Sequence, residues 1–175
     1  MSIYPDTASL GILLARLVVG PLMMAHGAQK LLGWFGGYGL AGTGGFFEGL
    51  GWRPGRAFAA AASLAEVTGG ALILLGFLGP VGPALLLSVM IVAAISVHWQ
   101  HGVFASGNGI EVPLLYGTAA VTLALTGFGR FSLDAALGGD RLWTPGLVWG
   151  ALAIGVLAGV VNLALRRPAP QTSTA

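Results

Sequence analysis

Five long apolar runs dominate the chain and limit what it can fold into. They cover residues 10–32, 57–78, 81–97, 112–128 and 147–165. A helix of about 20 apolar residues spans a bilayer, and each run is near that length, although the fourth is short. Only 8% of the 175 residues are charged, whereas a soluble domain carries about 25%. The sequence therefore predicts an all-α integral membrane helical bundle with five spans.

The connections between these runs are of different kinds. The second and third runs are joined only by Gly79 and Pro80, which predicts a tight antiparallel hairpin. Residues 33–56 combine many glycines with aromatic side chains. Glycine favours irregular backbone, and aromatic rings favour the membrane–water interface. We expect a structured, re-entrant loop there with a short helix near residues 46–50, and a more polar segment, 129–145, along the opposite surface.

Composition excludes several kinds of chemistry and partner. The chain has no cysteine, which rules out disulfides, thiolate catalysis and cysteine-held iron–sulfur clusters within it. Its basic residues are scattered beside apolar runs, so we expect the lipid bilayer and not a nucleic acid as its surroundings. The first run lacks a signal-peptide cleavage pattern and is interpreted as a retained helix.

The distribution of basic residues predicts an orientation. With five spans, one side of the membrane carries most of the basic residues. These are Lys30, Arg53, Arg56, Arg166 and Arg167. The positive-inside rule then places the glycine-rich loop and the C-terminal side of the last span in the cytoplasm.

Glu66 is the most unusual residue of the second run, because a carboxylate deep in a bilayer is costly without a partner or a role. On an antiparallel neighbouring helix, Arg16 lies within about 9 Å of it along the axis. The sequence predicts a buried Arg16–Glu66 ion pair that fixes helix register. The alternative is a proton or ligand site in the bundle core.

A second set of polar residues gathers at one end of the predicted bundle. It consists of His26, Lys30, His98 and Glu111. Beneath an aromatic loop, such a set predicts a pocket for a quinone-like ligand, in which histidine exchanges protons. Interfacial hydrogen bonding and snorkelling is the alternative. Nothing fixes a metal-ligand geometry, so no metal site is predicted. No catalytic residue can be assigned.

Small residues recur every fourth position on two of the predicted helices. They are Ala57, Ala61, Ala65 and Gly69 on the second, and Ala151, Gly155 and Gly159 on the fifth. This spacing is typical of close helix packing in membranes. We expect packing within the bundle, with a homo-oligomer face as the alternative.

Several of these segments together resemble the DoxX family of small bacterial membrane proteins. The resemblance is carried by the segments 26–31 (HGAQKL), 33–37 (GWFGG), 39–43 (GLAGT), Glu66 with Gly69 and Gly70, His98, 109–115 (GIEVPLL) and 129–134 (GRFSLD). It implies a four-helix bundle in a bacterial inner membrane, to which the fifth run is an addition. We therefore divide the chain into a DoxX-like membrane bundle at 1–137, a surface segment with an additional helix at 138–165, and a polar tail at 166–175.

The resemblance also suggests a function. Members of the family include subunits of thiosulfate:quinone oxidoreductases and components of membrane oxidoreductase complexes. It implies a membrane subunit of a redox or respiratory assembly that is at most non-catalytic or quinone-binding. A quinone is the one cofactor that the resemblance suggests, and the expected partners are other proteins of a membrane oxidoreductase complex. The other hypotheses are a non-enzymatic scaffold for partner proteins and a small-molecule or proton transporter built around Glu66.

Overall fold

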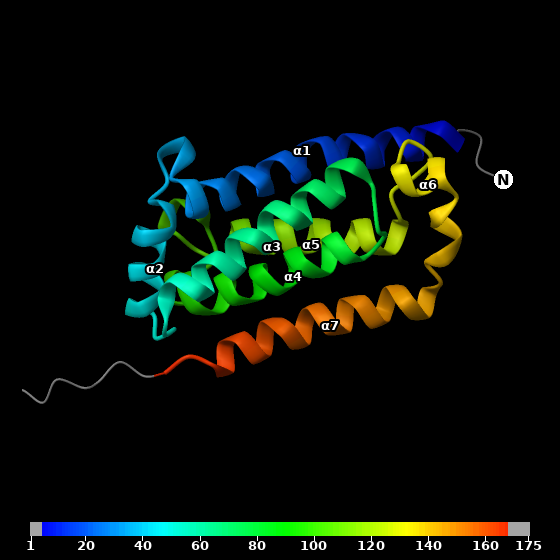
Figure 1. Ribbon diagram of the computed structural model, residues 1–175. Coiled ribbons are helices and arrows are strands. Elements are labelled where there is room, and N and C mark those ends of the chain that lie inside the picture. The colour runs from blue at the N-terminus through cyan, green and yellow to red at the C-terminus, as the bar shows by residue number, and fades with distance from the viewer. Residues whose placement is uncertain (1–4, 168–175) are drawn as a thin grey trace, which may run out of the picture.

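The computed structural model describes residues 5–167 as a bundle of helices without strands (Figure 1). Five helices run along the length of the bundle: α1 (Pro5–Leu32), α3 (Gly55–Leu75), α4 (Val81–Ala93), α5 (Glu111–Thr126) and α7 (Pro145–Ala164). The short elements at its ends are η1 (Trp34–Gly36), α2 (Gly39–Gly49), η3 (Trp99–His101), η4 (Ala105–Gly107), α6 (Leu133–Leu137) and η5 (Gly139–Leu142). Between α4 and η3, residues Ala94–His98 form a π-helical turn, η2.

Four of the helical segments are long and apolar enough to cross a membrane. They are Thr7–Leu32, Gly55–Leu75, Val81–His101 and Pro145–Ala164. The fifth, α5, is apolar but only 16 residues long, which corresponds to about 24 Å. The prediction of an all-α membrane bundle is confirmed, and the fourth run, expected to be short, falls below the length of the four membrane-spanning candidates. The protein is a multi-pass membrane protein whose helices contact the bilayer.

Helix packing places α4 at the centre of the bundle. It contacts α3 and α5 and, on a further side, α7, while α1 packs along α3. Glycines allow two of these helix pairs to approach closely. A Cβ on Gly20 would lie 2.8 Å from the Gly70 carbonyl oxygen, and one on Gly155 would lie 2.7 Å from the Ala84 carbonyl oxygen. Gly155 thus serves packing within the chain, as expected, whereas Ala61 of α3 remains exposed.

The two ends of the bundle are built differently. At one end the glycine-rich segment forms α2, which lies across the ends of the long helices and packs on α3 and α1 (Figure 1). The helix expected near residues 46–50 is therefore real but longer than predicted. At the opposite end lie α6 and η5, where the polar segment was expected. Beyond Arg167, the predicted polar tail lies outside the described residues.

Candidate functional site

Arg16 does not pair with Glu66. Its guanidinium donates instead to four backbone carbonyl oxygens: Ile73 at 2.9 Å, Leu74 at 2.8 Å, Phe128 at 3.0 Å and Phe131 at 2.7 Å. The first two belong to the last turn of α3, seven or more residues beyond Glu66, or about 10 Å along the helix. The predicted ion pair is wrong because unpaired carbonyls at a helix end satisfy a buried guanidinium as well as a carboxylate can.

Asp134 stabilises the end of the bundle at which the Arg16 guanidinium lies. Its carboxylate, 5% exposed, accepts hydrogen bonds from the Leu78 N–H at 3.0 Å, the Gly79 N–H at 2.7 Å and the Trp143 indole N–H at 3.0 Å. It thereby ties the α3–α4 turn to the segment that leads into α7. These contacts use its acceptor capacity for structure, so this end offers no free carboxylate at Asp134.

Glu66 pairs with Lys30 of α1. The Lys30 ammonium donates to Oε1 of Glu66, while Oε2 is buried without a hydrogen-bond partner. Glu66 is 1% exposed, whereas the Lys30 side chain is 29% exposed. Lys30 therefore links the buried Glu66 carboxylate to a more exposed part of the bundle.

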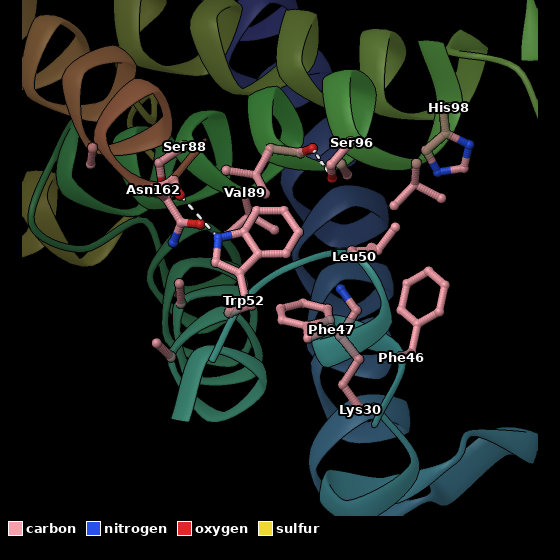
Figure 2. A pocket seen from close by; sticks show the side chains of 17 residues that line it. Lys30, Phe46, Phe47, Leu50, Trp52, Ser88, Val89, Ser96, His98 and Asn162 are labelled. Carbon is pink, nitrogen blue, oxygen red and sulfur yellow. Dashed lines mark hydrogen bonds between the residues drawn. The ribbon is translucent and has the colours of Figure 1, made fainter. Parts of the chain in front are cut away.

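A cavity of about 340 Å³ lies beside this ion pair. Figure 2 shows Lys30 and His98 at its walls, together with aromatic residues of the α2 segment and Trp52. The π-helical turn η2 supplies Ser96, Val97 and His98 to the lining. Such turns recur at functional sites because they displace side chains from the regular helical spacing. The cavity thus joins α1, α2, α3, α4 and α7 in one place.

His98 is oriented by the loop that follows α4. Its Nδ1 lies 2.7 Å from the Asn108 carbonyl oxygen. A carbonyl oxygen only accepts, so Nδ1 must carry the proton. In the neutral ring, Nε2 is then an acceptor, available to a ligand hydroxyl.

The other two predicted ligand residues lie elsewhere. His26 packs edge-on against Tyr116 of α5, with ring centroids 5.9 Å apart. The Glu111 carboxylate accepts from the Ala105 N–H at 2.7 Å and closes its own loop. Neither lines the cavity, so the predicted four-residue set separates into Lys30 and His98 at the cavity, and two residues with structural contacts.

Trp52 closes the end of the cavity and was not singled out by the sequence patterns. It is 1% exposed, and its indole N–H donates to the Asn162 carbonyl of α7 at 2.9 Å. Beside it, Arg166 donates to the Leu50 carbonyl at 3.0 Å. Its place amid glycines predicted an interfacial aromatic residue, but the contact to α7 depends on folding that no local signal reveals.

A bundle of apolar helices with one buried ion pair and a cavity at one end defines a polytopic α-helical membrane protein. The sequence profile of the DoxX family matches residues 11–99, half of the chain. The chain belongs to the DoxX family. The matched region contains Arg16, Lys30, Glu66 and His98 but ends before Glu111 and α7. No curated protein and no solved structure matches the chain.

Proposed function

We propose that the protein is a membrane subunit of a redox assembly and that its cavity binds the head group of a quinone-like ligand. The observation that carries the proposal is that Lys30 and His98, from different helices, line the same cavity of about 340 Å³. Known small-molecule sites have volumes of about 300–1,000 Å³ and combine apolar walls with few polar groups.

Lys30 and His98 can hydrogen-bond the oxidised and the reduced form of a quinone, respectively. The Lys30 ammonium can donate to a quinone carbonyl oxygen, and Nε2 of His98 can accept from a quinol hydroxyl. Reduction of a quinone to a quinol takes up two electrons and two protons. In this proposal the electrons come from a partner redox protein, as the family resemblance implies. One proton passes through His98, and the other is taken up from water at the α2 end. Phe46 and Phe47 offer aromatic walls to the ring.

We further propose a bacterial inner membrane location with the α2 end in the cytoplasm. Arg53, Arg56 and Arg167 are exposed at that end, and the positive-inside rule then orients the bundle. Electrons delivered by a cytoplasmic or membrane partner would reach the cavity from this side.

The test is native mass spectrometry of protein extracted gently from its own membrane. His98→Ala is compared with the control His101→Ala. The His101 ring lies three residues further along, 2.9 Å from the Val97 carbonyl oxygen, and does not line the cavity. We expect a stoichiometric quinone in the wild type and in His101→Ala, and its loss in His98→Ala. Protein that carries only bulk lipid contradicts the proposal.

A scaffold for partner proteins is the second candidate. Several aromatic side chains at the α2 end are strongly exposed, among them Trp34 at 59%, Phe35 at 70%, Tyr38 at 87%, Trp99 at 70% and Phe104 at 71%. Exposed aromatic residues anchor a protein at the membrane interface and also form the centres of protein–protein contacts. Crosslinking in the native membrane distinguishes the two roles, because a scaffold yields a specific second polypeptide that Tyr38→Ser with Phe104→Ser removes.

A further inference from the structure

The cavity extends from its polar end along the length of α4. Ser96 and Ser88 both line it, and eight residues of helix correspond to about 12 Å. Lys30 and His98 mark one end of this groove, and Ser88 with Ala65 marks the other. The groove therefore runs from the α2 end of the bundle toward its middle.

The side walls of the groove are small and reach the surface. Ala61 of α3 and Ala158 of α7 line it and are both exposed. α4 lies between α3 and α7 (Figure 1), and these two outer helices make little contact with each other. Because α3 and α7 are membrane-spanning candidates, an opening between them faces the hydrocarbon of the bilayer.

Access from the α2 end is narrowed. Trp52 lies beside Asn162, in the last turn of α7, and its indole N–H donates to the Asn162 carbonyl oxygen (Figure 2). The Gly51 carbonyl also accepts from the Arg167 N–H at 2.8 Å. Segments 50–52 and 162–167 thus bridge the two walls at this end. An opening between α3 and α7 therefore lies farther along the groove, where Ala61 and Ala158 are exposed.

The lysine and the histidine that line the groove both lie at its α2 end. Its α2 end carries the Lys30 ammonium and the His98 ring, whereas the deep part is lined by Ala65, Val89 and Val92. The Ser88 hydroxyl there donates to the Leu85 carbonyl of its own helix at 2.8 Å, so it does not require a polar ligand group. A site that is polar at the interface and apolar toward the middle of the membrane fits an amphiphile with a hydrocarbon tail.

We propose that the groove holds the first part of a single long hydrocarbon chain, and that the ligand reaches the cavity sideways from the bilayer between α3 and α7. The substrate class is thus a long-chain, membrane-dissolved amphiphile and not a water-soluble aromatic compound. That its head is a quinone rests on the proposed function; the chain and the route do not.

The test compares three probes on purified protein in detergent by native mass spectrometry. They are decylubiquinone, the same benzoquinone head without a tail, and farnesol, a chain without the quinone head. The variant is Ala61→Phe, which fills the groove wall. The control is Ala57→Phe, an exposed alanine one turn nearer the start of the same helix that does not line the groove.

We expect the tailed quinone to bind at least about tenfold more tightly than the bare head, since burying two methylene groups accounts for that much. Ala61→Phe should weaken binding of the tailed quinone much more than binding of the bare head, and so remove the advantage of the tail. Ala57→Phe should alter neither. If both quinones bind equally and Ala61→Phe changes neither affinity, the proposal that the groove holds the chain is wrong. The proposed function is unaffected by that result.

The farnesol arm separates the two proposals in the opposite case. If neither quinone binds but farnesol is retained by the wild type and lost in Ala61→Phe, the groove is supported and the quinone function fails. If Ala61→Phe changes the binding of neither decylubiquinone nor farnesol, the groove does not hold the chain, whichever head group binds. Circular dichroism of Ala61→Phe and Ala57→Phe confirms that both are folded.

Discussion

Lys30 holds the Glu66 carboxylate through a single oxygen, and the second oxygen is buried without a hydrogen-bond partner. Glu66 therefore depends on one cation from another helix. Removing that cation would leave a charge in the core of a membrane bundle, where an unpaired carboxylate is costly.

Lys30→Met should lower the free energy of unfolding by about 3–5 kcal/mol, because it strands the buried carboxylate. Adding Glu66→Gln should restore most of that loss, since the amide carries no charge. Unfolding of the two single variants and the double variant in mixed detergent gives the coupling energy directly. Additive effects of the two substitutions would show that the pair is not energetically linked.

Glu66→Gln also tests the transporter hypothesis. A bundle whose Glu66 serves structure should show the same proton and solute flux in proteoliposomes before and after this substitution. A fall in flux that Lys30→Met does not reproduce would instead give Glu66 a transport role.

Arg16→Lys should be strongly destabilising although it keeps the charge. The guanidinium spans carbonyls of α3 and of the segment after α5, a geometry that a lysine ammonium cannot match. We expect a loss of about 3–6 kcal/mol, the contribution of two hydrogen bonds to a charged group. Arg141→Lys, at an exposed position, is the control. Equal thermal stability of the two variants would contradict the assignment.

His26→Phe should leave ligand retention intact and change stability by less than about 1 kcal/mol. Phenylalanine preserves the edge-on contact with Tyr116, and His26 does not line the cavity. The measurement is native mass spectrometry beside His98→Ala. Loss of ligand from His26→Phe would restore His26 to the site.

Trp52→Phe should weaken the attachment of α7 by about 1 kcal/mol, the usual contribution of one hydrogen bond. The ring contact with Phe47, at 5.5 Å between centroids, is retained. Hydrogen exchange at the C-terminal turn of α7 should therefore quicken while exchange in α3 stays unchanged. Uniform acceleration across the bundle would point to global destabilisation.

Orientation can be read by single-cysteine labelling, because the chain has no cysteine of its own. Arg53→Cys should resist a membrane-impermeant maleimide in intact cells, and Arg141→Cys, at the other end, should react. Both positions are exposed. The reverse pattern would overturn the proposed cytoplasmic placement of the α2 end.

The fold followed from the sequence further than the site did. Length and apolarity of each run predict a membrane helix without knowledge of its neighbours, and the α3–α4 hairpin followed from two residues. The partner of Glu66 did not follow, because antiparallel alignment leaves Arg16, His26 and Lys30 all near it. Helix register decided the outcome. Gly20 of α1 lies against Gly70 of α3, so Arg16 is level with the end of α3 and Lys30 reaches back to Glu66.

Only two of the four residues predicted to line the cavity do so. Lys30 and His98 were expected at one end of the bundle and lie there. Glu111, although near His98 in the sequence, accepts from the Ala105 N–H of the loop that precedes α5. Asn162 and Trp52 meet across more than a hundred residues, a contact that no spacing rule encodes.

The position of α7 has a consequence for how the protein is made. Its Ala158 and Asn162 form one wall of the groove, and its two ends are fastened by Trp143 and Trp52 to earlier parts of the chain. While α7 is still being synthesised, the groove formed by the earlier helices lacks that wall and is open to lipid on that side. The ligand proposed above would then be retained only after α7 has packed, and a ribosome stalled before α7 would leave an inserted precursor whose cavity lacks one wall.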